Sequence, residues 1–437
     1  MSEKLENAKG TRDFLPEEKI LRDKITNKLV QVFELYGYSP IETPILMRYE
    51  VLSAKFAAGE ESDAMKETFK LKDQGDRDLG LRFDLTVPFS KFVGINPNLK
   101  MPFKRYEIGK VYRDGPIKLG RYREFWQCDV DIVGCSKMTA DAEIILLSLD
   151  AFKRMGLDAY MEVNNRKLLQ GLLLDCGVRE SLLISAMISL DKLDKYGKES
   201  VLKEMDENGI MPESGEMILE LFGKIKATKN NSERINLLRT VVKSDLAKQG
   251  LLEIESLMTF LDNCEANQVV LNAALARGLG YYTGTVFEGH LKNSKITSSV
   301  CGGGRYDEMI GQYLDAKVKN QFPAVGISFG LDVICEAIKI EGITVPKTVT
   351  QVFIIPIQTQ KQCFELAKVL RENDIRVDID LIGRGISKNM DYANKQEIPF
   401  VLFVGPDELA QGKVKLKDMK SGNEELIGVE EVMEKVK

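Results

Sequence analysis

The stretch FKRYEIGKVYRDGPIKLGRYREFWQCDVDIVG, residues 103–134, decides how the rest of this sequence is interpreted. Apolar and polar residues alternate on both sides of a Gly- and Pro-containing segment at 114–120, which is typical of two strands joined by a loop. Because side chains alternate between the two faces of a strand, Gln127, Asp129 and Asp131 are expected to share one face. The stretch therefore predicts a β-hairpin with an amide and two carboxylates side by side.

The segments around this hairpin predict a sheet that is interrupted by helices. Residues 17–36 place apolar residues mostly at spacings of three and four, as an amphipathic helix does, and residues 68–84 predict two short strands around a Gln-Gly-Asp turn. Strands in hairpin order favour an antiparallel sheet. A Leu-rich helical segment then interrupts it. Beyond that segment we expect strands at 283–291, 298–301 and 324–330, and helices at 305–314 and 331–340.

A linker at 342–350 leads into a second pattern, in which strands and helices alternate. VFIIPI, RVDIDLI, PFVLFVG and KVKLKDM predict strands, with helices at about 361–373 and 386–395, which indicates a compact α/β domain. The predicted organisation is α+β. Its boundaries are 1–165 and 264–341 for two parts of a sheet-bearing core, 166–263 for a helical insertion, and 351–437 for the tail domain.

Composition excludes several classes of protein. The 437 residues include 61 Lys and Arg against 66 Asp and Glu, a net charge of −5, so any contact with nucleic acid must use a local patch. No run of about 18 apolar residues is present, and the polar N-terminus lacks the apolar core of a secretory signal. We therefore expect a soluble, cytoplasmic protein with no membrane segment.

Cysteine and histidine chemistry is not expected to carry the function. Seven cysteines are scattered without a C-x-x-C pair, and we expect them to be reduced and mostly buried. His290 is the only histidine, and acid–base catalysis through it is not expected. The pattern identifies no metal site.

The motifs along the chain resemble those of the class II aminoacyl-tRNA synthetases, and among them the histidyl-tRNA synthetase family. KGTRDFLPEE at 9–18 is similar to that family's opening signature, GYSPIETPIL at 37–46 to class motif 1, and the hairpin at 103–134 to class motif 2. ARGLGYYTGTVFE at 276–288 is similar to the segment specific to the histidine enzymes. PAVGISFGL at 323–331 lies near class motif 3, and the tail resembles the family's anticodon-binding domain.

The resemblance implies an enzyme that activates L-histidine with ATP and Mg²⁺ and then transfers it to tRNA(His), as a homodimer built around motif 1. Its fold would be a class II antiparallel sheet flanked by helices, with the helical insertion and a C-terminal anticodon-binding domain. In this reaction the carboxylate of the amino acid attacks the α-phosphate of ATP. The protein therefore supplies positive charge and orientation, and needs no nucleophile of its own.

The resemblance also implies which residues meet the nucleotide. Arg113 and Arg277 match the family's pair of catalytic arginines, which would also bind ATP. Arginine suits this role because its planar, permanently charged group pairs with phosphate oxygens at two points. Arg121 and Tyr122, in the motif 2 loop, are candidates to reach ATP and the acceptor end of the tRNA.

A second set of residues matches the family's histidine-binding positions. Asp84, Thr86 and Gln127 would hold the ammonium group. Asp131 and Tyr282 would orient the imidazole, which offers one donor and one acceptor. Tyr281 either contacts the ligand or packs in the core. The complete substrate-binding set is Asp84, Leu85, Thr86, Gln127, Asp131, Tyr281 and Tyr282.

Two positions depart from the family pattern. Motif 3 of the class usually ends in Gly-Leu-Glu-Arg, and residues 330–333 read Gly-Leu-Asp-Val, so the arginine that holds ATP in the class is absent at Val333. Arg305 or a residue of the motif 2 loop are candidates to supply that charge. Gly280 stands where the family more often has Asp, and we interpret it as tolerated because Arg277 and both tyrosines keep their register.

The tail and the alternatives complete the interpretation. From residue 351 onward there are 13 Lys and Arg against 15 Asp and Glu. Arg384, Lys388 and Lys395 are spaced to share one side of a helix, which either binds phosphate or is merely solvated.

The rival function is a non-catalytic, synthetase-like regulatory subunit of histidine biosynthesis that senses histidine. Such a regulator is expected to lack the tail domain and Arg277. A class II synthetase of other specificity is disfavoured by the RGLGYY segment.

Overall fold

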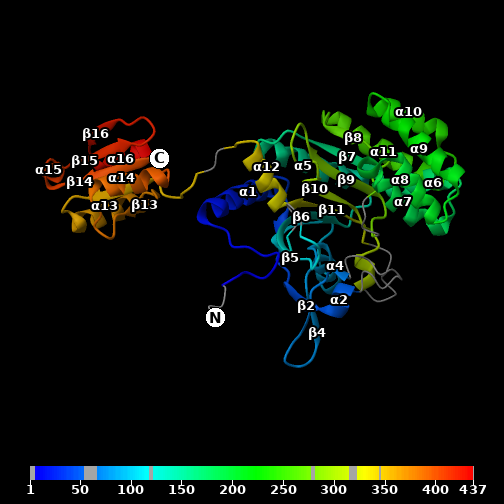
Figure 1. Cartoon of the computed structure of the whole chain (residues 1–437), viewed down its shortest axis with the longest axis horizontal. Helices are drawn as coiled ribbons and strands as arrows, with labels where there is room; N and C mark the ends of the chain where they lie inside the picture. The colour runs from blue at the N-terminus through cyan, green and yellow to red at the C-terminus, as the bar shows by residue number, and fades with distance from the viewer. Residues whose placement is uncertain are drawn as a thin grey trace. The chain divides into compact units, whose positions relative to one another are not determined.

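The computed structural model describes residues 5–53, 66–117, 122–276, 281–313, 322–343 and 346–436. The chain forms two compact units (Figure 1), one of residues 1–12 and 25–342 and the other of residues 13–24 and 343–437. Among the described helices, none combines the length and the apolar character that a membrane span requires.

The first unit is built on an eight-stranded sheet with the order β1-β5-β6-β11-β10-β9-β7-β8. The predicted hairpin is confirmed, because β5 and β6 pair antiparallel along their whole length. The centre of the sheet is antiparallel, as expected, whereas β1 pairs with β5 and β7 with β8 in parallel, so the sheet is mixed. The strands are β1 Ser39–Pro40, β5 Phe103–Tyr112, β6 Glu124–Val133, β7 Ala159–Asn165, β8 Val269–Leu271, β9 Thr285–Leu291, β10 Cys301–Arg305 and β11 Ala324–Gly330.

Helices cover this sheet. The expected first helix is α1, Pro16–Leu35, and the expected helix at 331–340 is α12, Leu331–Ile340. Helix α5, Met138–Met155, lies across β6, β11, β9 and β7 (Figure 1), where its Phe152 packs against Phe329 of β11. A small sheet of β2 Leu46–Arg48, β4 Asp78–Leu81 and β3 Lys70–Lys72, with α2 Tyr49–Ser53, precedes α4, Thr86–Ile95.

A block of helices connects the neighbouring strands β7 and β8 (Figure 1). Its first helix begins where the Asn165 side chain accepts hydrogen bonds from the backbone N–H groups of Lys167 and Leu168, a typical N-cap. The last helix packs against the first and against α5. The elements are α6 Arg166–Asp175, the 3₁₀ turn η2 Glu180–Leu182, α7 Leu183–Asp191, α8 Leu193–Glu207, α9 Pro212–Lys226, α10 Asn231–Val241 and α11 Asp245–Asn263.

Two local predictions were wrong around the glycine run at 302–304. The run was expected to follow a strand, but it forms β10 itself, and the helix expected at 305–314 is reduced to the 3₁₀ turn η3, Ile310–Tyr313. A Cβ atom on Gly303 would lie 2.0 Å from the carbonyl oxygen of Gly326 on β11. The glycines therefore permit a close approach of two strand backbones, which the pattern of residue types did not reveal.

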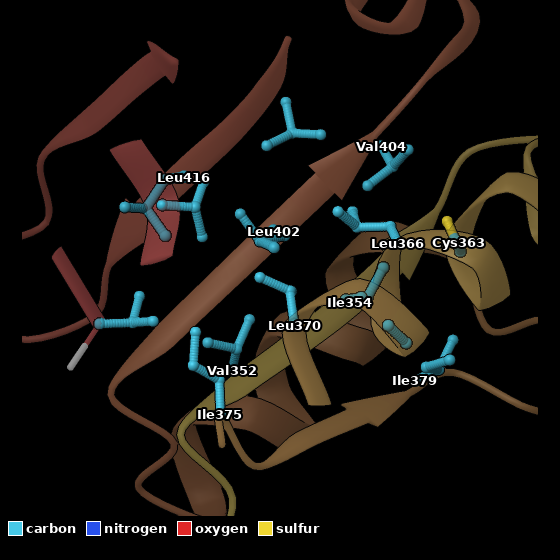
Figure 2. Close-up of a cluster of buried hydrophobic side chains, with 14 of the residues drawn as sticks. Val352, Ile354, Cys363, Leu366, Leu370, Ile375, Ile379, Leu402, Val404 and Leu416 are labelled. Carbon is cyan, nitrogen blue, oxygen red and sulfur yellow. The ribbon is translucent and has the colours of Figure 1, made fainter. Parts of the chain in front are cut away.

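The second unit contains a five-stranded sheet with the order β13-β12-β14-β15-β16, whose first three strands are parallel. On one side of this sheet, Ile354 and Leu402 pack against Leu366 and Leu370 of α13 (Figure 2). On the other side, Phe353 and Val401 pack with residues of α14. The elements are β12 Val352–Pro356, α13 Gln360–Glu372, β13 Val377–Ile379, α14 Ile386–Lys395, β14 Phe400–Val404, α15 Pro406–Ala410, β15 Val414–Asp418, β16 Glu424–Ile427 and α16 Val429–Val436.

Strand β13 is shorter than the RVDIDLI pattern predicts. The carboxylate of Asp380 accepts hydrogen bonds from the backbone N–H groups of Ile382 and Arg384, so the chain turns directly after Ile379. Arg384 consequently lies before α14, where its guanidinium stacks over the ring of Tyr392 at 4.8 Å. It does not share the helix with Lys388 and Lys395, as the spacing had indicated.

Candidate functional site

A row of charged side chains lies on the face of the central sheet opposite α5. Across the hairpin, Arg105 of β5 stands opposite Asp131 of β6, and Glu107 stands opposite Asp129. All four are buried, with 0–3% of each residue exposed. The polar half of the alternating pattern therefore faces the interior of the protein and not the solvent.

Two guanidinium groups neutralise part of this charge. Nη2 of Arg105 lies 2.6 Å from Oδ2 of Asp131, and its guanidinium carbon lies 4.2 Å from the ring centroid of Phe89 on α4. Nη1 of Arg82 donates to Oε1 of Glu107 at 2.9 Å and to the carbonyl of Thr43, in the motif 1 segment, at 2.7 Å. With Asp84, which is also buried, the group holds four carboxylates against two guanidinium groups.

Asp129 experiences this excess of negative charge most strongly. Burial and the neighbouring carboxylates of Asp131 and Asp84 raise the pKa of Asp129 to about 8, although Arg105 opposes the shift. Burial also raises the pKa of Asp131, against the effect of Arg105 and of a hydrogen bond from Tyr306. The site therefore favours either a proton or an added cation beside Asp129.

Two acceptor oxygens on this face have neither a hydrogen-bond donor nor an ion-pair partner among the residues that the structure describes. They are Oε1 of Gln127 and Oδ1 of Asp129, both buried. The amide nitrogen of Gln127 is already used, since it donates to Oγ of Ser328 on β11 at 2.9 Å. Buried acceptors are rarely left without a donor, so this pair is typical of a site that a ligand completes.

A cluster of tyrosines borders the same face. The hydroxyl of Tyr306 donates to Oδ1 of Asp131 at 2.5 Å, and the ring of Tyr281 lies 6.3 Å from that of Tyr306 and 4.6 Å from that of Tyr282. Gly326 lies beside Asp131, and a Cβ atom there would come within 1.9 Å of Asp131 Oδ1. The glycine leaves the space that the carboxylate occupies.

The start of α4 brings the expected residues Asp84, Leu85 and Thr86 to this face. Oδ1 of Asp84 accepts a hydrogen bond from the backbone N–H of Val87 at 2.9 Å, and α4 begins at Thr86. The carbonyl oxygen of Leu85 accepts a hydrogen bond from Nη2 of Arg105 at 3.4 Å. Arg105 therefore connects the helix start to the row of carboxylates.

The residues that were expected to bind the nucleotide are described only in part. The guanidinium of Arg113, just after β5, lies over the rings of Phe83 at 4.1 Å and Phe125 at 5.0 Å. The guanidinium of Arg12 lies 4.3 Å from the ring centroid of Tyr122. Arg121 and Arg277 lie outside the described residues.

Arg305 is placed differently from the expectation that it could supply charge to ATP. It is 3% exposed, forms an ion pair with Asp141 of α5, and donates to the carbonyl oxygen of Cys135 at 2.9 Å and to Asp307 at 3.2 Å. These contacts use its guanidinium to hold β10 against the start of α5.

Sequence reasoning placed Asp129 on this face without giving it a role, and it missed other residues of the site. Arg105 stands opposite Asp131 on the alternating strand β5, so the period of two could have identified it. Tyr306 and Ser328 reach the site because β10 pairs with β11 and β11 pairs with β6. No local pattern predicts this pairing.

The cysteines are mostly buried, as expected. None of the seven forms a disulfide, and five of them are buried. His290 stacks on Tyr160 and lies 3.4 Å from Glu288 on β9. In the part of the chain that the structure describes, no group of three His, Cys, Asp or Glu side chains could hold a metal ion.

Comparisons with known protein families match nearly the whole chain. The family model of histidyl-tRNA synthetase matches residues 10–334, and an anticodon binding domain model matches residues 351–437. A Bacillus cereus protein named histidine–tRNA ligase 1 is 44% identical over 423 residues, which are 96% of this chain and 96% of that protein.

Two solved structures share the fold. The crystal structure of histidyl-tRNA synthetase from Nostoc sp. PCC 7120 matches with a TM-score of 0.87 and 30% identity, over 100% of this chain and 99% of that one. An ATP phosphoribosyltransferase regulatory subunit/histidyl-tRNA synthetase from Bacillus halodurans matches with a TM-score of 0.75 over 92% and 99% of the two chains, and at 24% identity it shows the fold alone. By its sequence over nearly its whole length and by its fold, the chain belongs to the histidyl-tRNA synthetase family.

Proposed function

We propose that this chain activates L-histidine with ATP and transfers it to tRNA(His). The observation that carries the proposal is the buried face on which, among the described residues, four carboxylates share two guanidinium groups, and Oε1 of Gln127 and Oδ1 of Asp129 have neither a hydrogen-bond donor nor an ion-pair partner. Burying carboxylates without full neutralisation is costly, so such a face favours a ligand that brings positive charge and donors. An ammonium group brings one charge and three donors.

The ammonium group of histidine fits between Gln127 and Asp129. Oε1 of Gln127 and Oδ1 of Asp129 would each accept one of its protons, and Asp84 contributes negative charge from the start of α4. We assign Thr86, the first residue of α4, and Leu85, which is held by Arg105, to the same end of the ligand. A charge-assisted contact of this kind is stronger than one between neutral groups.

The imidazole of histidine is assigned to the carboxylate of Asp131. Arg105 and Tyr306 fix the position of that carboxylate, and Tyr281 and Tyr282 line the space beside them. A ligand without an imidazole donor leaves this buried carboxylate one hydrogen bond short of the set that we assign to it. Sites built in this way reject analogues that lack the matching polar group.

The nucleotide is assigned to the opposite end of the motif 2 hairpin. Arg113 and Arg277 would stabilise the charge that builds on the α-phosphate as the histidine carboxylate attacks it. Arg121 and Tyr122 would contact ATP and the end of the tRNA. Mg²⁺ would arrive bound to the phosphates of ATP, as it commonly does at nucleotide sites.

Residues 351–437 are proposed to bind the anticodon of tRNA(His). The match to an anticodon binding domain supports this assignment, and the exposed cations Lys388 and Lys395 on α14, with Arg384 before it, can meet phosphate groups. We also propose that two chains pair through the motif 1 segment and that the reaction takes place in the cytoplasm. The two core parts, 1–165 and 264–341, would act as one catalytic domain that carries the insertion at 166–263.

The test is the exchange of labelled pyrophosphate into ATP. The wild-type chain should catalyse exchange that depends on histidine and on Mg²⁺, and the Arg277→Ala variant should bind histidine nearly normally. That variant should lose exchange by roughly 10²- to 10³-fold, the scale for removing a preorganised charge. A wild-type chain that binds histidine without any exchange at saturating ATP would instead support a histidine-sensing regulator.

A further inference from the structure

The N-terminal segment is fixed to the end of the motif 2 loop. The carbonyl oxygen of Gly10 accepts hydrogen bonds from the backbone N–H groups of Arg123 at 2.9 Å and Glu124 at 3.4 Å. Gly10 has φ +86°, and a Cβ atom there would lie 2.6 Å from Cγ of Arg123. Only glycine suits both conditions, so the segment approaches the loop closely and in one conformation.

This docking places the guanidinium of Arg12 between motif 2 and motif 3. One face of the guanidinium lies 4.3 Å from the ring centroid of Tyr122, and Nη2 lies 3.2 Å from Oδ1 of Asp332. The other oxygen of Asp332 accepts a hydrogen bond from the backbone N–H of Trp126 on β6 at 3.1 Å. The side chain of Asp332 is 5% exposed, whereas that of Arg12 is 33% exposed.

Arg12 also lies in the same corner as the assigned nucleotide residues. The backbone N–H of Arg113 donates to the carbonyl oxygen of Arg123 at 2.9 Å, and Arg123 in turn donates to Gly10. Three chain segments therefore run side by side, and they carry Arg12, Tyr122 and Arg113. The guanidinium of Arg113 stacks over Phe125, one residue before Trp126.

Position 333, next to Asp332, holds a valine and brings no charge. Arg305 is buried in its ion pair with Asp141 and holds β10 to α5. Among the described residues considered for this charge, Arg12 is the one whose guanidinium reaches motif 3 from a side chain that is 33% exposed.

We propose that Arg12 is a nucleotide-binding residue, which pairs with the triphosphate of ATP and takes the place of the arginine that is absent at 333. Asp332 and the ring of Tyr122 hold the guanidinium in position, which lowers the entropy that ATP binding would otherwise cost. The inference rests on the proposed function, because it concerns the ATP subsite of that reaction.

The experiment compares the KM values for ATP and for histidine in pyrophosphate exchange. The Arg12→Ala variant should raise the KM for ATP by about 10- to 100-fold, the effect of one charged hydrogen bond, and leave the KM for histidine nearly unchanged. Adding Val333→Arg to this variant should recover most of the loss, because it restores a guanidinium at the position where the class has its arginine. Arg239→Ala, which removes an exposed arginine from α10, is the matched control and should change neither KM.

The outcomes separate this inference from the function on which it rests. A wild-type chain without histidine-dependent exchange contradicts the proposed function itself. If the wild type is active and Arg12→Ala raises both KM values equally, or if Val333→Arg recovers nothing, Arg12 only supports the fold. Should Arg12→Ala fail to fold, Arg12→Lys carries the test, with a severalfold rise in the KM for ATP alone as the supporting result and an unchanged KM as the overturning one.

Discussion

Strands β6 and β14 occupy the same kind of position in their sheets, yet they carry different residues. β14 is the middle strand of the tail sheet, with Leu402 packed toward α13 and Val401 packed on the opposite side. β6 lies inside the eight-stranded sheet, with Val130 and Ile132 on one face and Asp129 and Asp131 on the other. Both strands are covered on both faces, but only β14 is apolar on both.

The difference separates strand faces that stabilise the fold from a strand face that we assign to ligand binding. Burying a carboxylate costs free energy unless a partner neutralises it, so a purely structural strand has no use for Asp129 and Asp131. An alternating strand is ordinarily explained by solvent on its polar side. In this chain that side is buried, and we attribute its polar residues to the ligand proposed above.

The largest effect is expected where the polar face loses its central cation. Arg105→Met leaves Glu107, Asp129 and Asp131 buried without that guanidinium, so the free energy of unfolding should fall by about 3–5 kcal/mol. Urea denaturation followed by hydrogen exchange of β5 and β6 measures the change. Arg105→Lys keeps a charge and should lose less, and a loss below about 1 kcal/mol for the methionine variant would mean that the face does not depend on its ion pairs.

The apolar strand should respond in stability alone. Leu402→Ala opens a cavity in the tail core and should lower the stability of that unit by about 2–5 kcal/mol. Hydrogen exchange should rise in β12 and β14, while histidine-dependent pyrophosphate exchange keeps its rate. A parallel fall in pyrophosphate exchange would show that the two regions are not energetically separate.

The polar strand should respond in ligand binding. Asp131→Ala removes the proposed partner of the imidazole and should weaken histidine binding by roughly 5- to 150-fold, the equivalent of about 1–3 kcal/mol, with little change for ATP. Titration calorimetry with each ligand measures both affinities. Equal weakening of histidine and ATP would argue against the assignment of Asp131 to the histidine pocket.

The smallest effect is expected in how the free energy of unfolding depends on pH. Because burial and the nearby carboxylates raise the pKa of Asp129 to about 8 in the folded chain, the native state holds a proton that the unfolded state releases above about pH 4. Stability contributed by this proton is complete below about pH 4 and is lost as pH rises through about 8. Asn cannot ionise, so Asp129→Asn should lose about 1–2 kcal/mol less stability than the wild type between pH 7 and pH 9. Urea denaturation at both pH values measures this difference. An equal loss of stability in the wild type and in the variant would contradict the prediction.

Local patterns predicted most of the elements but only part of the site. The alternation at 103–134 identified β5 and β6, and periodic apolar residues identified α12 and α14 with the bounds observed. Gln127 and Asp131 were found because they share a strand and a motif. Tyr306 could not be found in this way, since its contact with Asp131 depends on the order of β6, β11 and β10 in the sheet. Long-range pairing is a property of the fold and not of any window of sequence.

The connection between β7 and β8 has a consequence for how this protein can be shortened. The two strands are parallel neighbours, so the chain must cross from the end of one to the beginning of the other, and a tight turn cannot do this. Helices α6 to α11 form that crossing, and α11 lies against both α6 and α5. A shortened version of the protein must therefore retain a crossing segment of about a dozen residues or more between β7 and β8.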